Sequence, residues 1–119
     1  MEHRKHHRFP VQFRSSFSSA NVVTGEGKLE DLSIRGCRIF SMTEVKQGTA
    51  LQVRVQISEG EPPIQISQAV VRWCRANSFG LEFVTLSPDE WARLQHVVKG
   101  LEMEPYQRQK QDAELAQSS

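Results

Sequence analysis

The chain has 119 residues, a formal net charge of +1 and a hydrophobic content of 38%. These values fit one soluble domain with a modest core, and they exclude a polycation that binds nucleic acid in bulk. No apolar run approaches the ~18 residues that a membrane-spanning helix needs. Met1–Arg4 is not followed by the apolar stretch of a signal peptide, so we expect a cytoplasmic protein.

Residues 1–9 consist almost entirely of charged and imidazole side chains, which predicts an arm rather than a core element. The first 14 residues carry four Lys or Arg side chains against one Glu, a local charge of 4 − 1 = +3 before the histidines are counted. An anionic partner for this end is one interpretation, and a solvated basic tail is the other.

Alternating apolar and polar residues predict a strand over residues 10–17, because successive side chains of a strand point to opposite faces. The segment Asn21–Gly27 contains two glycines and is predicted to be a hairpin connection. Lys28–Ile34 and Cys37–Phe40 are predicted to form two further strands, joined by a tight turn.

The clearest strand is Leu51–Ile57, in which every odd position is aliphatic and every even position is polar. In the strand that follows, Ile64 and Ile66 belong to one register, whereas the apolar residues after them belong to the other. A β-bulge near Ser67–Gln68 would resolve this conflict. A last strand over residues 79–83 completes the series.

Ser87, Pro88 and Glu90 predict a helix N-terminus, with Ser87 as the N-cap and Glu90 closing a capping box. An apolar stripe follows at helical spacing. The helix is expected to end near Gly100, because Pro105 opposes its continuation. The stripe consists of Trp91, Leu94, Val98 and Leu101.

About six strands followed by one helix predict an all-β fold with a C-terminal helix, a six-stranded antiparallel barrel that is closed or nearly closed. Residues 1–9 would form the arm, 10–104 the barrel with its helix, and 105–119 a disordered tail with little to bury. The predicted core contains Leu51, Val53, Val55, Ile57, Phe79, Leu81, Phe83, Trp91 and Leu94.

Two short motifs carry the polar chemistry. Arg4 and Arg8 are separated by three residues, and the arginine guanidinium binds phosphate or the guanine edge through paired hydrogen bonds. Asp31 and Ser33 lie two apart, so one strand would point both to the same face. Gly36 is expected to turn the chain with a positive φ.

These groups together describe an anionic, guanine-bearing ligand, since an ionised Asp31 accepts hydrogen bonds from a guanine edge. The alternative is purely structural. Arg4 and Arg8 would then be solvated, while Asp31 and Ser33 would satisfy the amides of the turn.

The pattern RxxxR followed by (D/N)xSxxG resembles the signature of the PilZ family, over roughly residues 3–100. The resemblance implies a small barrel that binds cyclic di-GMP. The implied ligand-binding residues are Arg4, Arg8, Asp31, Ser33 and Gly36, and the possible accessory contacts are His3, Lys5, Arg35 and Arg38. Many family members have arginine at the position of His3, so one or two ligand molecules per site both remain open.

The histidines and the other polar residues give little indication of a metal site or of an enzyme. His3, His6 and His7 have no carboxylate or Cys at a spacing that helps to hold a metal, and no metal cofactor is expected. No nucleophile elbow is present, so an enzyme is not expected. Cys37 and Cys74 are predicted to be buried, reduced thiols, and a disulfide between them is the alternative.

We therefore expect a stand-alone, non-catalytic receptor for cyclic di-GMP whose arm changes conformation on binding. Arg4 lies three residues after Met1, so the signal is expected to leave through a surface presented to a partner protein. The alternatives are a degenerate PilZ-like adaptor that binds no nucleotide, and a small-barrel binder of single-stranded nucleic acid. The latter requires exposed aromatic residues on the barrel.

Overall fold

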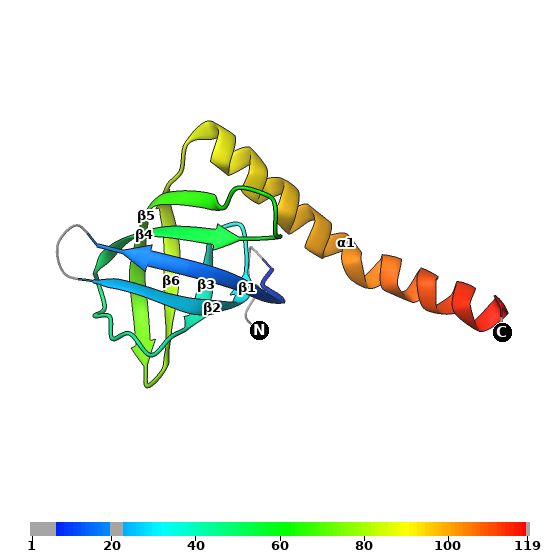
Figure 1. Ribbon diagram of the computed structural model, residues 1–119, viewed down its shortest axis with the longest axis horizontal. Helices are drawn as coiled ribbons and strands as arrows, with labels where there is room; N and C mark the ends of the chain where they lie inside the picture. Colours follow the sequence, from blue (N-terminus) through cyan, green and yellow to red (C-terminus); the bar gives the residue numbers. More distant parts are fainter. Residues whose placement is uncertain (1–6, 20–22, 119) are drawn as a thin grey trace, which may run out of the picture.

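The computed structural model of the protein describes residues 7–19 and 23–118, with side chains described up to residue 103. Within this part of the chain, six strands are followed by one helix (Figure 1). The elements are β1 (Phe9–Ser18), β2 (Thr24–Leu32), β3 (Gly36–Phe40), β4 (Ala50–Gln56), β5 (Ile64–Arg75), β6 (Ser78–Thr85) and α1 (Pro88–Ser118).

The strands form a closed barrel in the order β1-β2-β3-β6-β5-β4, and every neighbouring pair is antiparallel. Closure comes from the pairing of β4 with β1, in which Val55 lies opposite Ser15. The predicted fold class, an antiparallel barrel with a C-terminal helix, is thereby confirmed. Because the barrel closes, its six strands leave no edge open for pairing with another chain.

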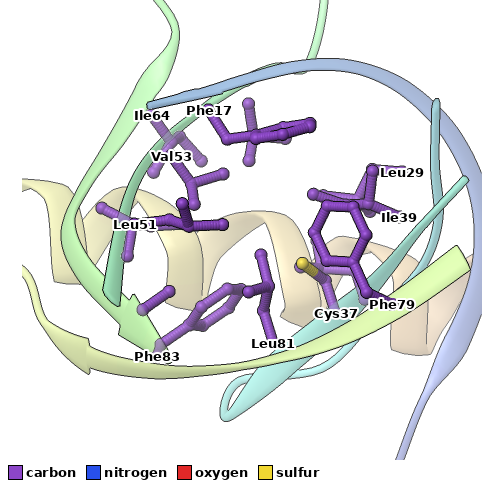
Figure 2. Packing of buried hydrophobic residues seen from close by; sticks show 14 of the residues in the cluster. Phe17, Leu29, Cys37, Ile39, Leu51, Val53, Ile64, Phe79, Leu81 and Phe83 are labelled. Atoms are coloured by element: carbon purple, nitrogen blue, oxygen red, sulfur yellow. The ribbon is translucent and has the colours of Figure 1, made fainter. Parts of the chain in front are cut away.

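The core fills the barrel interior, where inward side chains of all six strands meet (Figure 2). The rings of Phe17 and Phe79 pack edge to face with centroids 5.2 Å apart, the geometry that the aromatic quadrupole favours. Alternation in β4 is as predicted, since Leu51, Val53 and Val55 are buried. Ile57, just past the end of β4, is only partly buried.

The predicted bulge in β5 is confirmed. Ala69 lies opposite Leu51 and Ile66 opposite Val53, so β5 advances by three residues over an interval in which β4 advances by two. Ile66 and Ala69 are both buried, whereas Ser67 and Gln68 between them are exposed. The extra residue therefore brings two apolar registers onto one face.

The expectation that Gly25 and Gly27 lie in a hairpin connection is wrong, because both belong to β2. A Cβ on Gly25 would strike the Phe17 ring, and one on Gly27 would strike the carbonyl oxygen of Phe40. These glycines let the strands approach closely. The connection is shorter than predicted, and Ser19 N–H donates to Val23 O at 2.8 Å across it.

The N-cap of α1 is confirmed, since Glu90 N–H donates to Ser87 Oγ at 3.3 Å. Glu90 does not close the predicted capping box. Its Oε2 instead accepts the backbone N–H of Gln65 in β5 at 2.7 Å. The guanidinium of Arg93 donates to the carbonyls of Pro62 and Pro63. These bonds fasten the first turns of α1 to the loop between β4 and β5.

The apolar stripe of α1 differs from the prediction at one residue. Leu94 is buried, and Val97, Val98 and Leu101 pack against the core. Trp91, predicted to be buried, is 36% exposed. It lies at one margin of the stripe, and Val97 at the other margin packs in its place, because the bonds of Glu90 and Arg93 fix how the helix is rotated.

The helix is also longer than predicted. It continues through Gly100 and Pro105 to Ser118 and extends away from the barrel (Figure 1). The residues after Pro105 are rich in Gln, Lys, Arg, Glu and Ala, which favour helix once it has started. Within the described residues, no helical stretch is both long enough and apolar enough to cross a bilayer.

Candidate functional site

The two motifs meet at one end of the barrel. Arg8 lies just before β1 and Asp31 near the end of β2, where Asp31 is paired with Pro10. Arg8 Nη1 lies 2.9 Å from Asp31 Oδ1. The side chain of Arg8 is 33% exposed and that of Asp31 is 16% exposed. Residues 23 apart in the sequence thus form an ion pair that solvent still reaches.

A second guanidinium approaches the same carboxylate from β3. Arg38 lies opposite Asp31 in the β2–β3 register. Its Nε is 3.7 Å from Asp31 Oδ2 and 3.7 Å from Glu30 Oε1. Asp31 therefore lies between two guanidinium groups, one near each of its carboxylate oxygens. Glu30 was not predicted to take part, although the strand register alone places it near Arg38.

Ser33 lies in the turn between β2 and β3, because β2 ends at Leu32. The prediction that Ser33 shares a strand face with Asp31 is therefore wrong. Ser33 Oγ is buried and accepts the backbone N–H groups of Arg35 and Gly36, each at 3.1 Å. The backbone N–H of Ser33 donates to Gly36 O at 2.8 Å. Its side chain thus holds the turn closed, the use of serine known from ST turns.

Gly36 is needed for close approach rather than for its φ angle. Among the described residues, a positive φ, which was expected of Gly36, occurs only at Gly48 and Gly60. A Cβ on Gly36 would strike the carbonyl oxygen of Leu81 in β6. The turn is fastened to the same strand, since Phe83 N–H donates to Arg35 O at 2.8 Å.

The two cysteines differ from the prediction in one respect. Cys37 follows the turn and is a buried free thiol, but Cys74 is exposed, and its thiol donates to Val45 O at 3.3 Å. Burial raises the pKa of Cys37 well above its usual range, the charge of Asp31 raises it further, and Arg8 opposes both. Cys37 is therefore neutral at physiological pH and suited to the core.

Comparison with known proteins now identifies the family. The family model described as PilZ domain matches residues 2–100. The chain belongs to the PilZ domain family. No curated protein sequence matches it.

Solved structures share the fold of this PilZ domain at low sequence identity. Escherichia coli YcgR, crystallised in complex with c-di-GMP, has a TM-score of 0.73 at 20% identity, over 91% of this chain and 50% of that chain. The PilZ domain of CeSA from a cellulose-synthesizing bacterium has a TM-score of 0.66 at 19% identity, over 81% and 98%. Bacillus subtilis inhibitor of motility (MotI/DgrA) has a TM-score of 0.69 at 15% identity, over 87% of this chain and 53% of that chain. The chain thus spans about half the length of YcgR and of MotI.

The PilZ signature maps onto this end of the barrel only in part. Arg8, Asp31, Ser33 and Gly36 are brought together there, with Arg35 and Arg38 beside them. Arg4, His3 and Lys5 lie outside the described residues. In the part of the chain with described side chains, no three His, Cys, Asp or Glu residues are grouped to hold a metal ion.

Proposed function

We propose that this PilZ domain is a non-catalytic, cytoplasmic receptor for cyclic di-GMP that passes occupancy of its site to a partner protein. One observation carries the proposal most directly. The Arg8–Asp31 ion pair joins the first motif to the second, although the two are far apart in the sequence. The complex of YcgR with c-di-GMP supports it, since the barrel is shared.

Each residue has a distinct proposed task. Arg4 and Arg8 bind the phosphates and guanine edges through bidentate hydrogen bonds. Asp31 accepts N–H groups of a guanine. Ser33 and Gly36 shape the turn against which the ligand lies, and the Ser33 hydroxyl acts through its hydrogen bonds to the turn amides.

The Arg8–Asp31 pair also suggests how binding alters the protein. A phosphate competes with Asp31 for Arg8, and Arg38 lies on the other side of Asp31 to balance its charge. The arm, of which residues 1–6 lie outside the described residues, then folds onto the ligand, a conformational switch. On adding cyclic di-GMP, amide hydrogen exchange over residues 4–9 should slow, while exchange in β4 stays unchanged. Unaltered exchange in the arm of a saturated protein would refute the switch.

Calorimetric titration with cyclic di-GMP tests the receptor, with the linear GMP dimer and GTP as ligand controls. Arg8→Ala and Asp31→Ala should each weaken binding by at least ~10-fold, since a bidentate contact contributes about 1–3 kcal/mol. Arg75→Ala is the matched control, because Arg75 is exposed and is the last residue of β5, at the opposite end of the barrel. Its affinity should equal that of the wild type.

The rival functions are outcomes of the same titration. A folded wild-type protein that binds no cyclic di-GMP would make the chain a degenerate adaptor. Binding of single-stranded nucleic acid is disfavoured by burial, since Phe79, Leu81 and Phe83 all point into the core. Stacking on bases requires aromatic rings at the surface.

A further inference from the structure

A concavity of about 970 Å³ lies on the outer face of the barrel, across β2, β1 and β4, and charged side chains stand among the residues that line it. Gln12, Arg14 and Ser16 of β1 form its floor. Lys28 of β2 and Arg54 of β4 form the sides. These residues define what we call the outer groove, which is separate from the Arg8–Asp31 site.

Three cations meet in the outer groove. Arg14 lies directly opposite Lys28 in the β1–β2 register, and Arg54 lies opposite Ser16, one row away. Like charges directly opposite each other on neighbouring strands are destabilising. Among the described residues, no side chain forms an ion pair or hydrogen bond with the side chains of Arg14, Lys28 or Arg54. The groove therefore carries positive charge that an anionic partner would balance.

The shape and the remaining lining residues restrict the partner. Glu26 and Glu59 also line the groove, and two carboxylates repel a dense cluster of phosphates. They suit a peptide, whose backbone N–H groups donate to carboxylates while its own acidic side chains reach the cations. The barrel is closed, so a peptide cannot add to it as a further strand, and side chains must carry the recognition.

The groove also adjoins the proposed ligand site along the chain. β1 begins immediately after Arg8, its Pro10 is paired with Asp31, and its register shifts between Pro10 and Phe13. Gln12, within that irregular stretch, lines the groove. The strand that forms the floor of the groove therefore begins at the residue after Arg8.

We propose that the outer groove binds an extended acidic segment of a partner protein, with Arg14, Lys28 and Arg54 pairing with its carboxylates. This inference deepens the proposed function by giving it an output surface. Binding of the peptide does not require cyclic di-GMP, so either proposal can fail alone.

The test is a fluorescence-anisotropy titration of a labelled peptide of about eight alternating Glu and Thr residues, which extends over ~26 Å as a strand. The same peptide with Gln in place of Glu is the ligand control. The peptide should bind saturably at low salt, the Gln peptide should not, and added salt should weaken binding.

Two double variants with the same change in net charge locate the site. Arg14→Glu/Arg54→Glu should weaken peptide binding at least ~10-fold, because like-charge juxtaposition costs several kcal/mol, and should leave cyclic di-GMP affinity unchanged. Lys46→Glu/Arg75→Glu alters exposed cations at the other end of the barrel and should bind the peptide as the wild type does. Equal loss in both variants, or no binding by the wild type, would overturn the proposal. Tighter binding of tripolyphosphate than of the peptide, lost in Arg14→Glu/Arg54→Glu, would also overturn it in favour of a phosphorylated ligand.

Discussion

The α-carbon of Gly36 faces the carbonyl oxygen of Leu81 across the β3–β6 pair so closely that no side chain fits between them. Gly36 is also a proposed ligand-site residue. The same position therefore serves the stability of the barrel and the shape of the turn at the site. A loss of ligand binding on substitution of Gly36 has to be interpreted together with a measurement of stability.

Gly36→Ala is expected to lower the free energy of unfolding by about 1–3 kcal/mol, since overpacking forces the backbone apart. Gly100→Ala is the matched control. Gly100 lies within α1, and a Cβ there meets no atom within 4 Å. It should stabilise the protein by about 0.5–1 kcal/mol through helix propensity. Chemical denaturation measures both, and equal effects of the two substitutions would contradict the packing argument.

Val55→Ala should cost about 2 kcal/mol, the loss of two buried carbon groups together with the cavity that remains. Val55 is 2% exposed. Gln52→Ala, on the exposed face of the same strand, should be nearly silent. Gln56 is an unsuitable control, because its Nε2 donates to the carbonyls of Ser58 and Glu61. Thermal unfolding of the two variants checks the inward and outward assignment of β4.

The exposure of Trp91 gives a third test. Leu94→Ala should destabilise the protein by about 2–5 kcal/mol, because Leu94 is 1% exposed. Trp91→Ala should have a much smaller effect, although tryptophan is the larger residue. If the two substitutions shifted the denaturation midpoint equally, the rotation of α1 on the barrel would differ from the one described.

The burial of the Cys37 thiol predicts that the stability of the protein depends on pH. Burial raises its pKa in the folded state, whereas the unfolded thiol titrates near ~8.5. Below that pH both states hold the proton, and above it only the unfolded state loses it. The free energy of unfolding should therefore fall by about 1.4 kcal/mol per pH unit above pH ~9.

Two cysteine variants check this assignment by chemical denaturation across the same pH range. Cys37→Ala should remove the cysteine contribution to the slope, whereas Cys74→Ser should keep it, because Cys74 is exposed. A slope that persisted in Cys37→Ala and disappeared in Cys74→Ser would reverse the assignment. In the native wild type, only Cys74 should react rapidly with a thiol reagent.

The sequence by itself determined the strands, the bulge and the start of the helix. The alternation over residues 51–57 and the change of phase between Ile66 and Ala69 are local patterns. A strand with one buried face must turn its apolar side chains to that face, so each pattern permits only one register. The N-cap at Ser87 is equally local, since its hydroxyl bonds an amide three residues away. The two motifs were likewise evident from their spacing, but not the contact between them.

Only the tertiary structure decided what depends on neighbours distant in the sequence. Gly25, Gly27 and Gly36 look like turn glycines, yet each is required because a strand from elsewhere lies against it. Trp91 belongs to an apolar stripe and Cys74 to a strand with buried residues, and their exposure follows from how α1 docks and from the register shift in β5 between Val71 and Trp73. The pairing of Arg8 with Asp31 also depends on distant neighbours, because antiparallel pairing of β1 with β2 brings the start of β1 beside the end of β2.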